Sequence, residues 1–418
     1  MIDYRTFTLD NGLRVAHSCD PQTAMTAVNI LYDTGARDEA PGLTGIAHLF
    51  EHLMFGGSAN VRDYSGEIEA AGGMDNAWTS NDFTNFYEVL PAQNIETAFW
   101  LESDRMLAPS LDEKTLSVQR QVVIEEFKQQ CLNRPYGDLA HYLRRMLYGD
   151  SHPYAWPVIG KTPEHVASVT PDDARRWFFD HYGPDNAVLA VTGNIAFEKV
   201  EELAHKWFGP IPRRNIARRS LPTPEFPVAD VVERVSGDVP QTAIAIAFPM
   251  AAYGDKDYFV ADTITDLLSA GRSSRFYRNL LMGGSGLFSE VDASISGSEH
   301  EGFMIFNAKL NDGSDAAVEK AIAMMMAEAR ALAVTGGVSE YELERCMNRF
   351  ESTFNFSNMG YQSRAANLAM SLYHGEDINS TVERQRRTTC GDISRVAEEL
   401  FIGKPSATLI YSPAKIEE

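Results

Sequence analysis

The pattern of apolar positions repeats in the two halves of the chain. Alternating apolar residues predict a strand near the start of each half, at 26–31 and 242–248, and a helical segment follows each strand. Each half also closes on an amphipathic helix and then a strand, at 172–182 with 186–192 and at 393–401 with 407–411. The repeat predicts a duplicated structural unit.

Long helical patterns alternate with strand candidates in the first half. The helical patterns cover 95–106, 113–130 and 137–148, and 85–90 is a strand candidate. Such an order favours helices packed on an antiparallel or mixed sheet. The predicted fold class is therefore α+β, with two tandem duplicated domains that each pack helices on a mixed or antiparallel sheet.

A proline-rich stretch lies close to the middle of the chain. Residues 209–227 contain five prolines and four arginines. Proline at this density removes backbone donors and stops helices, so an extended surface connection is predicted. We therefore predict an N-terminal domain at 1–209, a linker at 210–232 and a C-terminal domain at 233–418.

The composition favours a globular protein that does not bind nucleic acid. The 418 residues are 44% apolar, enough to build two or more domain cores. The net charge of −21 repels phosphate backbones and excludes nucleic acid as an expected partner. This acidity is equally consistent with a cationic peptide partner and with a surface that only keeps the protein in solution.

The sequence contains no recognisable export or membrane signal, and its cysteines show no disulfide spacing. The chain has no apolar stretch long enough for a membrane span, and the segment 1–5 lacks the features of a signal peptide. We predict a cytoplasmic protein, or a periplasmic one if an export signal was removed. The four cysteines are far apart and are expected to be free, buried thiols.

The chemistry is concentrated in the segment His48-Leu49-Phe50-Glu51-His52. His48 and His52 are one helical turn apart, so their ring nitrogens can converge on one ion. Glu51 lies beside that ion on the same side of the helix. A catalytic zinc site needs a third protein ligand as well, which leaves one position open for water.

The third ligand is expected from the helical segment 117–127. Glu125 and Glu126 are adjacent there and point about 100° apart on a helix, so only one of them can face a given metal. The equivalent place in the second half, 264–271, contains no histidine. The duplication therefore kept the scaffold twice and the predicted metal chemistry once.

The order His-x-x-Glu-His resembles the inverted zinc motif of the pitrilysin and insulinase family of zinc peptidases, which includes the mitochondrial processing peptidase. The resemblance extends over essentially the whole chain and is tightest at 9–160. It is carried by four further segments: Leu9-Asp10-Asn11-Gly12-Leu13-Arg14-Val15, Asp33-Thr34-Gly35-Ala36-Arg37-Asp38-Glu39, Gly72-Gly73-Met74-Asp75-Asn76-Ala77-Trp78-Thr79-Ser80 and Arg120-Gln121-Val122-Val123-Ile124-Glu125-Glu126.

The resemblance implies a two-domain fold like that of the processing peptidase, and a role for each motif residue. His48, His52 and Glu126 would be the ligands of one Zn²⁺ per chain, and Glu51 the general base. The family usually has a glutamate two helical turns before the third ligand, where it supports the metal ligands by hydrogen bonding. This chain has Gln119 at that position. Glutamine can still orient a ligand but brings no negative charge, so the metal affinity is expected to differ.

The resemblance also implies how a peptide binds. The family adds extended peptides as a strand to a sheet edge, which makes Asn76 and Ala77 the expected substrate-binding residues. Active relatives use an arginine and a tyrosine from the C-terminal half. Arg275 matches the arginine, but Ser289 stands where the tyrosine is expected. We therefore expect a homodimer, or a heterodimer with a related chain that carries the Arg/Tyr pair.

Two functions follow from the resemblance. The first is a zinc-dependent metallo-endopeptidase that hydrolyses extended or unfolded peptides, with Glu51 activating a zinc-bound water. The second is a non-catalytic or partner-dependent structural subunit of the same fold. Such subunits usually lose a motif residue, and this chain keeps all four.

Overall fold

The computed structural model describes residues 1–217 and 219–414. Backbone contacts divide the chain into two compact units. Unit 1 comprises Met1–Phe127, Pro157–Leu221 and Thr353–Thr381. Unit 2 comprises Lys128–Trp156, Pro222–Ser352 and the residues from Val382 on.

Unit 1 is built on a mixed sheet of six strands in the order β1-β2-β6-β3-β5-β4. The strands are β1 (Arg5–Thr8), β2 (Arg14–Cys19), β3 (Met25–Tyr32), β4 (Met74–Thr79), β5 (Thr84–Pro91) and β6 (Ala187–Gly193). The central strand β3 is antiparallel to both β5 and β6, while β2 runs parallel to β6. β4 forms one edge of this sheet and pairs with β5.

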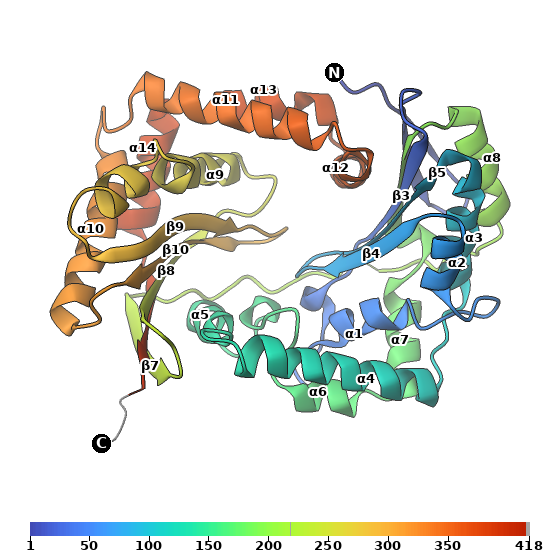
Figure 1. Cartoon of the computed structure of the whole chain (residues 1–418), viewed down its shortest axis with the longest axis horizontal. Helices are drawn as coiled ribbons and strands as arrows, with labels where there is room; N and C mark the ends of the chain where they lie inside the picture. Colours follow the sequence, from blue (N-terminus) through green and yellow to red (C-terminus); the bar gives the residue numbers. More distant parts are fainter. Residues whose placement is uncertain (218, 415–418) are drawn as a thin grey trace. The chain divides into compact units, whose positions relative to one another are not determined.

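Helices cover both faces of the unit 1 sheet (Figure 1). They are α1 (Ile46–Leu53), α2 (Tyr64–Ala70), α3 (Ile95–Leu107), α4 (Glu113–Phe127), α6 (Pro163–Ser168), α7 (Pro171–His181), α8 (Phe197–Trp207) and α12 (Tyr361–His374). One face packs on α1, α3, α7 and α8 through a large apolar core, and the other packs on α12. Burial on both faces explains why β3 and β6 are apolar almost throughout.

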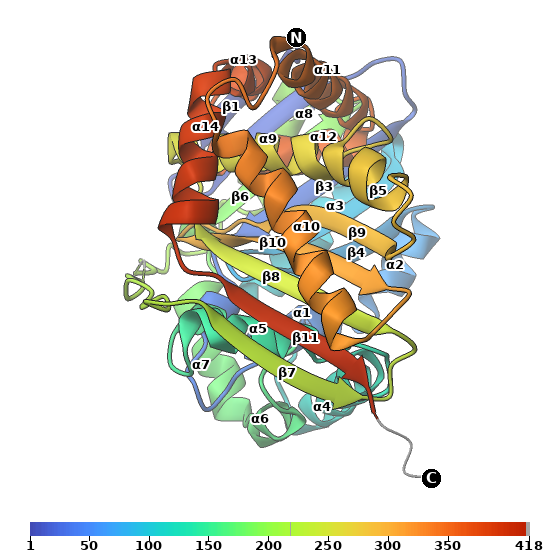
Figure 2. The ribbon, with the colours of Figure 1, turned by 90° about the vertical axis from the view of Figure 1, so that its left-hand side faces the viewer.

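Unit 2 repeats the same sheet with one strand fewer (Figure 2). Its order is β7-β11-β8-β10-β9, from β7 (Val231–Gly237), β8 (Thr242–Met250), β9 (Phe288–Ser296), β10 (Gly302–Leu310) and β11 (Ala407–Pro413). β8 is antiparallel to β10 and β11, and β7 runs parallel to β11, as β3 and β2 do in unit 1. This match confirms the predicted α+β fold of two like units.

The helices of unit 2 also lie on both faces of its sheet. They are α5 (Leu139–Tyr148), α9 (Lys256–Ser269), α10 (Asp315–Ala333) and α14 (Cys390–Glu398). The sequences of α11 (Glu340–Ser357) and α13 (Thr381–Arg386) are each divided between the two units. α9, α10 and α14 build the main core with β8, β9 and β10. α5 packs against β8 and β11.

Each unit takes one helix from the other half of the sequence. α12 lies within 233–418 but packs on β3 and β6 of unit 1, and α5 lies within 1–209 but packs on β8 and β11 of unit 2. The predicted domains 1–209 and 233–418 are contiguous, whereas the compact units exchange these two segments. An apolar helix face shows that a helix packs, but not on which sheet it packs.

The predicted elements are present with small shifts at their ends. The helical pattern 113–130 is an α-helix as far as Phe127, and a π-helical turn, Lys128–Leu132, continues it. Residues 212–217 and 219–228 form neither helix nor strand, and β7 begins at Val231. Among the described residues, no helix combines the length and the apolar character that crossing a bilayer requires.

Candidate metal centre

The helix α1 turns one face into the core and leaves three polar side chains on the other. Its apolar residues Ile46, Leu49, Phe50 and Leu53 are buried, while His48, Glu51 and His52 are half-buried. The helical period places these three side chains together on the side that the core does not use.

The start of α1 is held by a buried carboxylate. Glu39 is fully buried, and its Oε1 accepts hydrogen bonds from the backbone N–H groups of Gly45 (2.9 Å) and Ala47 (3.0 Å). A carboxylate satisfies the free donors of a helix N-terminus and favours its positive dipole end. Gly45 has φ of +87°, and a Cβ there would lie 2.8 Å from the Ile159 carbonyl oxygen, so the turn requires glycine.

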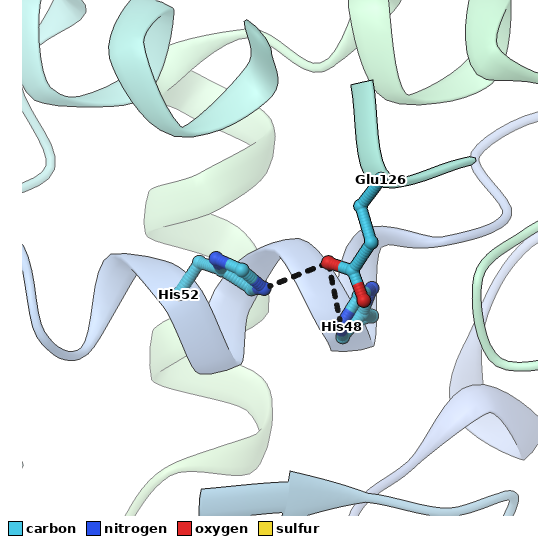
Figure 3. A group of neighbouring side chains, drawn as sticks. All are labelled: His48, His52 and Glu126. Atoms are coloured by element: carbon cyan, nitrogen blue, oxygen red, sulfur yellow. Dashed lines mark ion pairs between the residues drawn. The ribbon is translucent and has the colours of Figure 1, made fainter. Parts of the chain in front are cut away.

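Helix α4 brings the third side chain. Val123 and Phe127 are buried on one side of α4, and the Arg120 guanidinium donates to the Val169 carbonyl oxygen at 2.9 Å. Figure 3 shows Glu126 reaching from α4 towards both imidazoles. Its Oε2 lies 3.4 Å from His52 Nε2 and 3.7 Å from His48 Nε2.

The three side chains fit a tetrahedral zinc site. With metal–ligand bonds of about 2.1 Å, neighbouring corners of a tetrahedron are about 3.4 Å apart. The Glu126 to histidine separations of 3.4 and 3.7 Å match that spacing. Among the described residues, this is the one group of three or more His, Cys, Asp or Glu side chains whose ligand atoms all lie within 4.8 Å of one another.

The protonation of the group also suits a metal. Burial lowers the pKa of His48 to about 4, so its ring is neutral near pH 7. A hydrogen bond with His52 lowers the pKa of Glu126, which keeps that carboxylate ionised. Metal binding needs neutral imidazole and deprotonated carboxylate. His48 and Glu126 therefore already have the protonation states that metal binding needs.

Glu51 is oriented by the edge strand of the sheet. Thr79, the last residue of β4, donates a hydrogen bond from Oγ1 to Glu51 Oε2 at 2.5 Å. Burial raises the pKa of Glu51, which moves this carboxylate towards the range of a proton acceptor that later returns the proton. An oriented carboxylate therefore lies beside the candidate metal ligands.

Two family models match the chain. Residues 14–141 match the insulinase model, peptidase family M16, and residues 168–350 match the model of the M16 inactive domain. The chain belongs to peptidase family M16. His48, Glu51, His52 and Glu126 lie in the first matched region, and the sheet and helices of unit 2 account for most of the second.

Known relatives match all or part of this M16 chain. It is 28% identical over 422 residues to PqqE, a zinc protease of Helicobacter pylori. This match covers 98% of this chain and 93% of that protein. The beta subunit of the Saccharomyces cerevisiae mitochondrial-processing peptidase is 32% identical over 62% of this chain and 56% of its own length. A solved protease structure from Helicobacter pylori matches with a TM-score of 0.88 at 26% identity, over 99% of this chain and all of that one.

The other predicted residues of unit 1 lie near the metal centre or on the edge strand. Gln119 is half-buried on α4, two turns before Glu126, while Glu125 is exposed and accepts a hydrogen bond from Gln121 at 2.9 Å. The geometry therefore places Glu126, not Glu125, at the two imidazoles. Asn76 and Ala77 lie in β4, with Asn76 exposed and Ala77 half-buried.

The two predicted residues of the C-terminal half lie in unit 2. Arg275 is buried and forms an ion pair with Glu342 at 3.1 Å, and it also donates to the Gly337 carbonyl oxygen. Ser289 is exposed on β9 and donates to the Lys309 carbonyl oxygen at 3.2 Å. The role of Arg275 towards substrate stays a prediction.

Two residues near the site were not singled out from the sequence. Thr79 lies two residues after Ala77, so the strand period places both side chains on the same face of β4. Glu39 precedes Gly45 by six residues, and no sequence spacing connects a buried carboxylate to a helix start at that distance.

Proposed function

We propose that this M16 family member is a zinc-dependent metallo-endopeptidase that hydrolyses extended or unfolded peptides. The observation that supports it most is the convergence of His48, His52 and Glu126, with Glu51 beside them on α1. The three ligands would hold one zinc ion per chain.

The chain's own residues supply the proton transfers. When bound, zinc would lower the pKa of water and polarise a peptide carbonyl. Glu51 would accept the proton of the attacking water and then deliver it to the leaving amine. The hydrogen bond from Thr79 leaves the second carboxylate oxygen of Glu51 for this exchange.

The edge strand β4 is the proposed binding site for the peptide. β4 pairs with β5 on one side, and its other side carries backbone groups that an added strand can use. Asn76 and Ala77 lie in the middle of this strand. Binding through main-chain hydrogen bonds suits extended peptides and gives weak selectivity for their side chains.

A partner-dependent enzyme is the second candidate function, and Ser289 favours it. Tyrosine is expected at this place in active relatives, and a serine hydroxyl on an exposed strand cannot reach as far. We propose a dimer, either of two identical chains or with a related chain that carries the Arg/Tyr pair. The non-catalytic form of this alternative predicts zinc binding without peptide cleavage.

Removing the metal tests the proposal directly. The purified full-length chain is expected to contain one zinc ion and to cleave a library of internally quenched peptides. Dialysis against a zinc chelator should abolish cleavage, and added zinc should restore it, because water activation depends on the metal. Stoichiometric zinc without cleavage, even after a related partner chain is added, would contradict the peptidase proposal.

The adjacent glutamates of α4 provide a matched pair for the third ligand. Glu126→Gln is expected to weaken zinc binding by more than about 100-fold, because loss of a supporting contact alone weakens metal sites by about 10–100-fold. Glu125→Gln should leave zinc binding unchanged, since Glu125 is exposed and bonded to Gln121. Competition with a chromophoric chelator measures both affinities. The opposite ranking would make Glu125 the ligand.

A further inference from the structure

The hydrogen bond between Thr79 and Glu51 joins the substrate strand to the metal helix. Thr79 closes β4 and pairs with Thr84 of β5, and its hydroxyl points to the face of the strand next to α1. Ala77 lies on the same face two residues earlier. One side chain of the proposed peptide-binding strand therefore contacts the proposed general base.

The Glu51 side chain needs such a partner to hold one orientation. A free glutamate samples many rotamers, and fixing one of them costs conformational entropy. Thr79 is β-branched and stands on a paired strand, so its χ1 angle is restricted. A hydrogen bond from a rigid donor fixes one carboxylate oxygen of Glu51 and thereby restricts where the other oxygen can lie.

Strand pairing does not involve the Thr79 hydroxyl, because backbone groups hold β4 to β5. β4 is held to β5 by a continuous ladder from Met74 with Val89 to Thr79 with Thr84. Among the described residues, the Thr79 hydroxyl forms its hydrogen bond with Glu51. A role in strand pairing or in capping a helix therefore does not account for the contact.

We propose that Thr79 is a positioning residue of the hydrolysis, which holds the Glu51 carboxylate in its reactive orientation from the strand that binds the peptide. This inference rests on the proposed function, because it assigns Thr79 a role towards the general base. It predicts that loss of the hydroxyl slows turnover while leaving the metal and the affinity for peptide in place.

The test compares Thr79→Val, which keeps the shape of the side chain, with Thr79→Ser, which keeps the hydroxyl. Thr79→Val is expected to lower kcat by about 10–100-fold, since misplacing a reactive group by 1 Å costs up to about 100-fold. KM and zinc content should stay close to wild type. Thr79→Ser should recover most of the lost kcat, and equal losses in both variants would overturn the inference.

Thr84→Val is the matched control. Thr84 is the pairing partner of Thr79, but its hydroxyl donates to the Thr34 carbonyl oxygen at 3.0 Å and not to Glu51. This variant should keep the wild-type kcat. A drop in kcat equal to that of Thr79→Val would assign the effect to packing of the sheet and overturn the role of Thr79.

A double substitution separates this inference from the proposed function. In a Glu51→Gln background, Thr79→Val should cause no additional loss of kcat, because its effect passes through Glu51. If Glu51→Gln itself keeps the wild-type kcat, Glu51 is not the general base, and the mechanism of the proposed function fails. If Glu51→Gln is inactive while Thr79→Val keeps the wild-type kcat, the inference about Thr79 alone fails.

Discussion

Glu51→Gln is expected to lower the kcat of peptide cleavage by about 100- to 10,000-fold, the range that a general acid–base group contributes. Glutamine keeps the size of the side chain and can still accept the hydrogen bond from Thr79. It cannot take a proton from water near neutral pH. The zinc content should stay at one ion per chain, because His48, His52 and Glu126 are unchanged.

The kinetics should be measured with a quenched peptide, together with zinc analysis and far-UV circular dichroism of the same samples. Glu67→Gln is a suitable control, since Glu67 is exposed on α2 and belongs to the same unit. That variant should match wild type. A Glu51→Gln protein that cleaves peptide at the wild-type rate would assign proton transfer to another group.

The five-residue motif could be predicted from the sequence because its geometry is local. His48, Glu51 and His52 lie within one helical turn, so the helical period alone places them on one side. Glu126 is 74 positions after His52, and the residues alone left Glu125 and Glu126 as alternatives. The choice depended on the family resemblance, and the packing of α4 against α1 supplies its physical reason.

The sheets and most helices could also be predicted, but the assignment of helices to units could not. The strands 26–31 and 242–248 and the helices around them follow from apolar periodicity. The exchange of α5 and α12 depends on contacts between segments far apart in the sequence. Amphipathic patterns are the same whichever sheet receives the helix, so they carry no information on this exchange.

The core of unit 1 contains a charge cluster that the apolar pattern does not reveal. Arg105 on α3 is fully buried, and its guanidinium bonds to the equally buried Glu102 and Glu88. Tyr64 donates to Glu88 at 2.6 Å, and the Arg105 guanidinium lies 4.2 Å from the centre of the Phe86 ring. Burial raises the pKa of Glu88, and the neighbouring Glu102 raises it further.

Arg105→Met is therefore expected to lower the free energy of unfolding by about 3–5 kcal/mol, because it leaves Glu102 without its buried partner. Methionine keeps most of the volume, so a cavity is not the cause. Arg175→Met is the matched control, since Arg175 also pairs with a carboxylate three residues away on a helix. That pair is exposed, with 52% and 85% of the two side chains accessible, and its loss should change stability by less than about 1 kcal/mol.

Urea unfolding followed by circular dichroism measures both variants. If Arg105→Met does not fold, the triple variant Arg105→Met, Glu102→Leu, Glu88→Leu decides the question, because apolar residues can replace a buried charge cluster with little loss of stability. If the triple variant folds and the single variant does not, the loss of stability comes from the carboxylates that the single variant leaves without a partner. An equal loss of stability in both variants would assign that loss to packing around Phe86 and Tyr64, and would contradict the electrostatic explanation.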